Sequence, residues 1–139
     1  MRILKTATLA ALTTFGGLGS ANLAYANEQP TGIWLDHTGR GAVKISDCNG
    51  NLCGRIVWVK DVKNGSACGT QIIGNAKPVS GGKWDGGWIL DVDEDRKYQV
   101  EITPLSNGKL KVMGYAGSKM LSETMIWTRA PADTKICSS

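Results

Sequence analysis

The chain has 139 residues, 42% of them hydrophobic, and a formal net charge of +4, which is the balance of an ordinary globular protein with room for one domain. Its Lys and Arg residues are spread along the sequence without a basic run, so we expect no nucleic-acid partner. There is also no basic amphipathic helix of the kind that binds membrane surfaces.

Residues 1–26 have the pattern of a cleavable signal peptide. Arg2 and Lys5 form a short positive region, an uncharged apolar stretch follows, and an Ala-Tyr-Ala motif ending at Ala26 has small residues where signal peptidase cleaves. A membrane-spanning anchor is the alternative, but Thr, Gly, Ser and Asn interrupt the apolar stretch. We therefore expect cleavage after Ala26 and a periplasmic or secreted protein without a membrane anchor.

Residues 27–139 then form a single mature domain, because no linker or repeat divides them. Loss of Arg2 and Lys5 with the leader lowers the net charge from +4 to +2.

Alternation of apolar and polar residues recurs through the mature domain, and this period of two is typical of strands with one buried face. Gly, Asn and Asp turns separate the alternating segments, and no amphipathic helix is evident. The expected strands, of which Thr70–Val79 is the weakest, are Gly32–Asp36, Val43–Ser46, Leu52–Lys60, Thr70–Val79, Gly87–Asp91, Lys97–Thr103, Lys109–Val112 and Leu121–Arg129. The pattern predicts an all-β protein, and an antiparallel up-and-down barrel of about eight strands would leave no open sheet edge.

Four cysteines lie in the exported part, where thiols are normally oxidised in pairs. Three pairings are possible. We favour Cys48 with Cys53, because the four residues between them form a hairpin loop that sets the two sulfur atoms opposite each other. Cys68 would then pair with Cys137. Zinc is the alternative, but there is no Cys-x-x-Cys pair, and the single histidine, His37, is distant in sequence from the cysteines.

Two motifs from the ends of the domain suggest how the barrel closes. A Gly-x-Trp sequence, Gly32 to Trp34, begins the first strand, and Arg129 ends the last. The pair resembles the lipocalin arrangement, which implies that the arginine covers the tryptophan ring at the barrel floor in a cation–π contact.

The interior motifs resemble one family more specifically. They are Leu52–Trp58, Trp84–Ile89, the Tyr98 strand, Lys109–Tyr115 and Trp127–Arg129. In this order they are similar to the secreted bacterial domain of unknown function numbered twenty-one forty-seven. The family is considered lipocalin-like, which implies a calycin-type barrel, and its members have no agreed activity.

No constellation in the sequence predicts an enzyme or a cofactor. Asp91, Asp93 and Asp95 have the spacing that opens a calcium loop, but Arg96 replaces the required glycine, so an acidic hairpin turn is the better interpretation. The serines lack a nucleophile elbow, and the carboxylates offer no single pair for a glycosidase.

Two functional hypotheses follow. The first is a module that binds a small apolar or aromatic molecule inside the barrel, because an eight-stranded barrel has room for one small ligand and five tryptophans could supply its walls. Its expected ligand-binding residues are Trp34, Trp58, Trp88, Tyr98 and Arg55. The second is a sealed barrel that binds or inhibits another envelope protein, with Trp84 on an exposed loop of residues 80–88 as the anchor.

Overall fold

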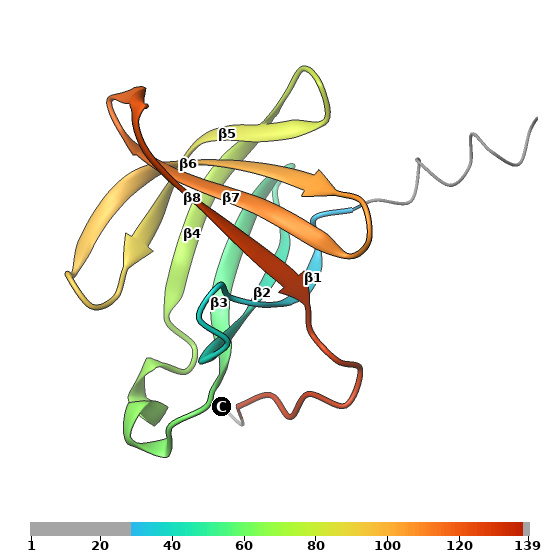
Figure 1. The fold of residues 1–139 in the computed structure, drawn as a ribbon, viewed down its shortest axis with the longest axis vertical. Helices are drawn as coiled ribbons and strands as arrows, with labels where there is room; N and C mark the ends of the chain where they lie inside the picture. The colour runs from blue at the N-terminus through green and yellow to red at the C-terminus, as the bar shows by residue number, and fades with distance from the viewer. Residues whose placement is uncertain (1–28, 138–139) are drawn as a thin grey trace, which may run out of the picture.

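Eight antiparallel strands form one closed barrel in the computed structural model, which describes residues 29–137 (Figure 1). Each strand pairs with the next in sequence, and the last pairs with the first through Trp34–Arg129 and Leu35–Thr128. The strands are β1 (Gly32–Leu35), β2 (Gly41–Cys48), β3 (Asn51–Val59), β4 (Gln71–Val79), β5 (Lys83–Asp91), β6 (Arg96–Leu105), β7 (Lys109–Ala116) and β8 (Ser118–Arg129). The predicted up-and-down barrel is confirmed.

The structure differs from the predicted elements in two segments. A short 3₁₀ helix, η2 (Val62–Ala67), connects β3 and β4, and the Asp61 side chain caps it by accepting a hydrogen bond from the Lys63 backbone nitrogen. The segment 80–88 is mostly strand, since β5 already begins at Lys83. Trp84 is half-buried and packs against the core, so the expectation that it anchors a partner from an exposed loop is corrected.

Strict alternation builds the core inside the barrel. On β6, Val100 and Ile102 are fully buried and face inward, and they pair with Gly114 and Val112 on β7. Glu101 stands between them in sequence and therefore faces the outer wall. The buried core comprises Trp34, Val43, Ile45, Leu52, Ile56, Ile72, Ile73, Ala76, Ile89, Val100, Ile102, Leu110, Val112 and Trp127.

One end of the barrel is sealed by Arg129 and Trp34. The guanidinium carbon lies 3.9 Å from the centroid of the tryptophan ring, and the guanidinium donates hydrogen bonds to the backbone oxygens of Thr31 (2.7 Å) and Gln29 (3.0 Å). The indole nitrogen of Trp34 donates to the Pro30 oxygen at 2.8 Å. A glycine is needed at position 32, because its φ is +126° and a Cβ there would lie 2.4 Å from the guanidinium. The contact that the sequence motifs imply is therefore present.

Two disulfides join the cysteines in the pairing that the sequence favours. Cys48–Cys53 spans the β2–β3 hairpin. Cys68–Cys137 ties the segment after β8 to the connection that follows η2, and the Cys137 backbone nitrogen also donates to the Val57 oxygen.

The expected signal peptide, residues 1–26, lies outside the described residues. Within residues 29–137, no helix is long and apolar enough to cross a membrane.

Candidate ligand-binding cavity

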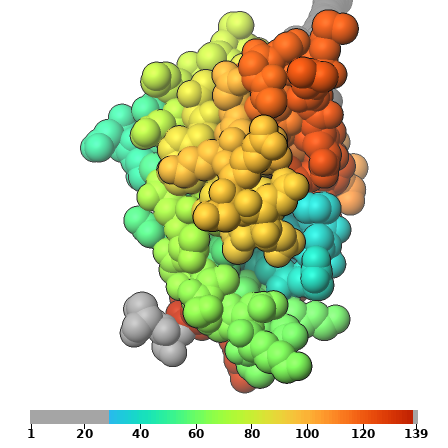
Figure 2. All heavy atoms as spheres, turned by 90° about the vertical axis from the view of Figure 1, so that its left-hand side faces the viewer, coloured from blue at the N-terminus to red at the C-terminus, as the bar shows by residue number. Residues whose placement is uncertain are grey.

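A cavity of about 1030 Å³ opens at the end of the barrel away from the Trp34–Arg129 seal. The connections β1–β2, β3–β4 and β5–β6 contribute residues to its lining, as does the part of β8 just after the β7–β8 turn (residues 120–123), whereas the connections at the other end contribute none. In an up-and-down barrel these four connections share one end. Figure 2 shows this face, with the β5–β6 turn in gold at its centre, the β7–β8 turn in orange-red above and η2 in green below.

The inner wall of the cavity is apolar. Its side chains come from the inward positions of several strands and include Val43, Ile56, Ile72, Ile89 and Trp127. All five are buried, and Trp127 is only 2% exposed. The wall therefore favours a hydrocarbon or aromatic body over a polar one.

The rim is acidic. Two of its five carboxylates lie on the β5–β6 connection and one each at the end of β5, on the β1–β2 connection and on β8, while Arg40 supplies the one side chain of fixed positive charge in the lining. None of the five forms an ion pair with another residue of the described chain. The carboxylates are Asp36, Asp91, Asp93, Glu94 and Glu123.

Hydrogen bonds hold part of this rim in place. Asp36 accepts from the Thr38 backbone nitrogen (3.0 Å) and hydroxyl (2.6 Å), and Asp91 accepts from the Glu94 nitrogen at 3.0 Å. The acidic β5–β6 segment is thus a capped hairpin turn, as interpreted from the sequence. The Tyr98 hydroxyl donates to Glu94 at 3.0 Å, and this bond raises the pKa of the phenol because the neutral form is the donor.

Exposed apolar side chains flank the opening. Met120 and Leu121 on β8 are 92% and 69% exposed, and Val92 on the β5–β6 turn is 47% exposed, although all three belong to the lining. A group of apolar side chains in water beside an apolar cavity is typical of a ligand entrance.

Of the five residues predicted to bind ligand, Tyr98 lines the cavity and the other four lie elsewhere. Trp34 belongs to the sealed end. Arg55 lies on the outside and donates to the Gly69 oxygen at 3.0 Å. Trp88 faces outward because its neighbour Ile89 faces inward, and the Lys97 ammonium lies 4.2 Å from its ring centroid.

Trp58 faces outward for a different reason. Its strand carries a bulge, since Ala42 pairs with Trp58 but Val43 pairs with Ile56, so Val57 is an extra residue that reverses the alternation. Trp58 lines a shallow surface depression with Leu35 and residues of the segment after β8. Trp127 does line the cavity but is not among the five residues expected to bind ligand, although its two-residue spacing from Met125 and Arg129 places it on one face of a strand.

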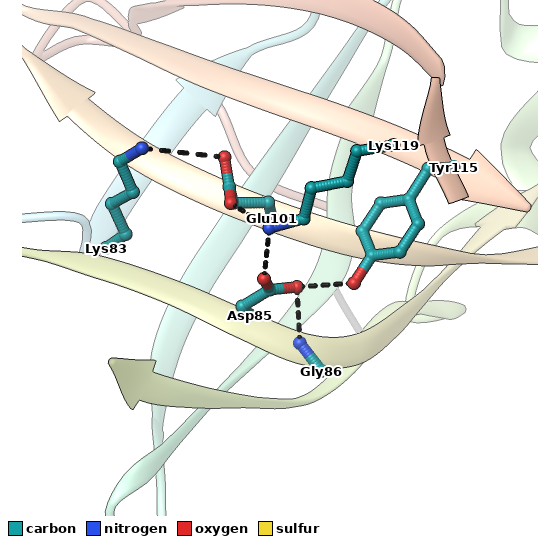
Figure 3. A network of polar contacts seen from close by, with 6 residues as sticks. All are labelled: Lys83, Asp85, Gly86, Glu101, Tyr115 and Lys119. Atoms are coloured by element: carbon teal, nitrogen blue, oxygen red, sulfur yellow. Dashed lines mark hydrogen bonds and ion pairs between the residues drawn. The ribbon is translucent and has the colours of Figure 1, made fainter. Parts of the chain in front are cut away.

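A polar network on the outer wall was not predicted (Figure 3). The Lys119 ammonium contacts Asp85 at 2.6 Å and Glu101 at 2.5 Å, and the Tyr115 hydroxyl donates to Asp85 at 2.6 Å. Lys83 approaches Glu101 from the other side at 4.0 Å. Lys119 is 34 residues from Asp85 and 18 from Glu101, and Tyr115 is 30 residues from Asp85. Only strand pairing therefore brings these side chains together.

This network shifts the pKa values of its members. Burial alone would raise the pKa of Asp85, but hydrogen bonds from Lys119, Tyr115 and the Gly86 nitrogen outweigh that effect and lower it. Burial and the bond to Asp85 raise the pKa of Tyr115. Contact with two carboxylates raises the pKa of Lys119. Because Lys119 adjoins Met120 and Leu121, the network holds one side of the cavity entrance against β5 and β6.

No group of three or more His, Cys, Asp or Glu side chains within the described part of the chain is arranged to hold a metal ion.

A closed eight-stranded barrel with one sealed end and one open cavity defines a lipocalin-like protein. A model of one family, described as an uncharacterized protein conserved in bacteria (DUF2147), matches residues 32–129, and the chain belongs to this family. A solved structure of a Helicobacter pylori protein, HP1028, described as belonging to the lipocalin family, is similar at a TM-score of 0.61. It shares 16% sequence identity, and the similarity covers 76% of this chain and 85% of that one. No curated protein matches the chain.

Proposed function

We propose that the protein is an exported binding protein that holds one small, largely apolar or aromatic molecule in the barrel cavity. The observation that carries the proposal is the cavity itself. Its volume of about 1030 Å³ reaches the upper end of the range for small-molecule sites, and its inner wall is apolar while its polar groups gather at the rim. The lipocalin-like fold supports the same function.

The proposal is for binding without catalysis. Within residues 29–137, the side chains with shifted pKa values are found mainly in the network on the outer wall, at Asp85, Tyr115 and Lys119. Tyr98 is the one that lines the cavity, and its proton is engaged by Glu94. Perturbed groups gather in enzyme active sites, so their position away from the cavity favours a carrier.

A substitution at Gly114 tests the proposal directly. Gly114 lines the cavity on β7, and a Cβ added there would meet the Ile89 side chain at 3.6 Å, which is ordinary contact. We expect the ring of Gly114→Phe to project into the cavity beside Ile89 and to weaken binding of dodecanol and N-phenyl-1-naphthylamine by about tenfold or more. Gly114→Ala is the matched control and should bind both probes almost as the native protein does.

Native mass spectrometry and isothermal titration calorimetry measure the affinities, and circular dichroism verifies that each variant is folded. Full affinity in a folded Gly114→Phe variant would place the probes outside the barrel and refute the proposal. Gly114→Leu, with a smaller side chain, provides an intermediate volume should the Phe variant unfold.

Export is part of the proposed function and has its own test. The pattern of residues 1–26 and the two disulfides both support an oxidising compartment outside the cytoplasm. Mass spectrometry of the protein from a periplasmic extract should give a chain that begins at Asn27 and has no free thiol. An intact Met1 in the cytoplasmic fraction would contradict this.

A further inference from the structure

We propose that the ligand is a cationic amphiphile, with its apolar body inside the barrel and an ammonium or amidinium group at the rim. This inference rests on the proposed binding function and specifies the class of ligand. The apolar wall described above selects the body, and the charge and hydrogen-bonding character of the rim select the polar end.

The rim presents a strong excess of negative charge to anything that enters. Five carboxylates line it against the single guanidinium of Arg40. Arg96 lies nearby but stacks on the Tyr98 ring, 5.2 Å from its centroid, and does not line the cavity. An anionic head group such as a fatty-acid carboxylate would be repelled, whereas a cation would be attracted.

The carboxylates also lack cations of their own. Every ion pair among residues 29–137 belongs to the network on the outer wall, where Lys83 and Lys119 neutralise Asp85 and Glu101. No protein cation is therefore paired with the carboxylates that line the cavity. A ligand ammonium entering the rim would supply the missing partner.

The hydrogen-bonding groups at the rim point to the same class. The hydroxyl proton of Tyr98 is donated to Glu94, and the hydroxyl proton of Thr38 is donated to Asp36. The Thr38 oxygen also accepts from the Arg40 backbone nitrogen at 3.1 Å. The remaining lone pairs of the two hydroxyl oxygens therefore face an incoming molecule, and the carboxylates only accept. A polar end rich in N–H donors fits such a rim better than an acceptor does.

Three probes with the same dodecyl chain separate charge from burial: dodecylamine, which is protonated at pH 7, dodecanol and dodecanoate. Titration calorimetry of the mature, oxidised protein is run below the micelle concentration of each probe. We expect dodecylamine to bind about tenfold more tightly than dodecanoate, with dodecanol between them. The preference should diminish as salt is added, because exposed charges are screened.

Substitutions at the rim test whether its carboxylates cause the preference for dodecylamine over dodecanoate. Asp93 and Glu123 make no side-chain hydrogen bond or ion pair within the described chain, so Asp93→Asn with Glu123→Gln should leave the loops intact. The double variant should reduce the ratio of dodecylamine to dodecanoate affinity by about threefold. Asp95→Asn is the matched control, since Asp95 lies in the same turn, does not line the cavity and has a φ of 52° that Asn accepts.

The outcomes separate the proposed class of ligand from the proposed binding function. If all three probes bind equally, or dodecanoate binds most tightly, the cationic assignment is overturned and the binding function stands. If the double variant keeps the native ratio, the rim does not select the ligand, which also overturns it. If none of the probes binds, the proposed binding function itself fails.

Discussion

The two ends of the barrel are formed by the same strands but differ in how far their side chains are buried and bonded. At the sealed end, Trp34 is 1% exposed, and Arg129 covers its ring while bonding the backbone that precedes β1. At the open end, apolar side chains such as Met120 stand in water and carboxylates lack ion partners. One end is thus closed by a buried, hydrogen-bonded contact, whereas the other exposes apolar and charged side chains, which leaves the open end available for a ligand.

The largest expected effect comes from removing the tryptophan of the sealed end. Trp34→Ala should lower the free energy of unfolding by about 3–5 kcal/mol, because it leaves a cavity in the core and removes the bond to Pro30. Urea denaturation followed by circular dichroism measures the change. A loss below about 1 kcal/mol would mean that the sealed end does not carry the stability assigned to it.

A smaller loss is expected for the arginine that covers this ring. Arg129→Gln removes the cation–π contact and the fork of hydrogen bonds to Thr31 and Gln29, so we expect a cost of about 1–2 kcal/mol by the same assay. Arg129→Lys, which keeps the charge but not the planar fork, should fall between the native protein and Arg129→Gln. Equal stability of all three proteins would contradict the role of the seal.

The outer-wall network should show in the pH dependence of stability. The pKa of Asp85 is lowered by folding, so its contribution is present above its ordinary value of 3.8 and is lost as the pH falls through its folded value. Lys119, whose pKa is raised, contributes fully below its ordinary value of 10.5. Both contributions are therefore present at neutral pH.

Accordingly, Asp85→Asn should lower the melting temperature at pH 7 and flatten its fall between pH 5 and pH 2, an interval of about three units that includes the transition. Thermal unfolding across this interval measures it. Asp133→Asn is the control, since Asp133 lies in the segment after β8 and makes no side-chain hydrogen bond or ion pair in the described chain. An unchanged pH profile for Asp85→Asn would show that the network is not coupled to folding.

The smallest effect on stability belongs to the open end. Met120→Ser should change the free energy of unfolding by less than about 0.5 kcal/mol, because Met120 is 92% exposed. It should nevertheless weaken binding of dodecanol, since Met120 lines the entrance. Val62→Ser is the matched control, because Val62 is 90% exposed on η2 but does not line the cavity. Equal losses of dodecanol affinity in Met120→Ser and Val62→Ser would mean that the entrance contributes no more to binding than other exposed surface.

The sequence predicts the barrel well because its signal is local. Alternation along segments such as Lys97–Thr103 identifies the strands, and the spacing of Cys48 and Cys53 identifies a hairpin. The contact of Arg129 with Trp34 at the sealed end follows instead from the resemblance of Gly32, Trp34 and Arg129 to the lipocalin arrangement. The strands and the hairpin need only period and order along the chain.

The cavity lining is harder to predict because it depends on which face each residue occupies. A single bulge turns Trp58 outward, although it lies two residues from the inward-facing Ile56. Trp88 was assigned to the wall by residue type, whereas its position beside Ile89 sets it outside. The Asp85–Lys119 contact depends on the register across β5 to β8, which no local pattern encodes.

The distribution of the indole rings should let intrinsic tryptophan fluorescence report ligand binding. Trp127 lines the cavity, while Trp34, Trp58, Trp84 and Trp88 lie in the sealed end, on the outer surface or elsewhere in the core. Emission from those four should form a constant background as the cavity fills. Any change in intrinsic fluorescence on binding should therefore arise from one ring, and it should disappear in Trp127→Phe while the calorimetric signal persists.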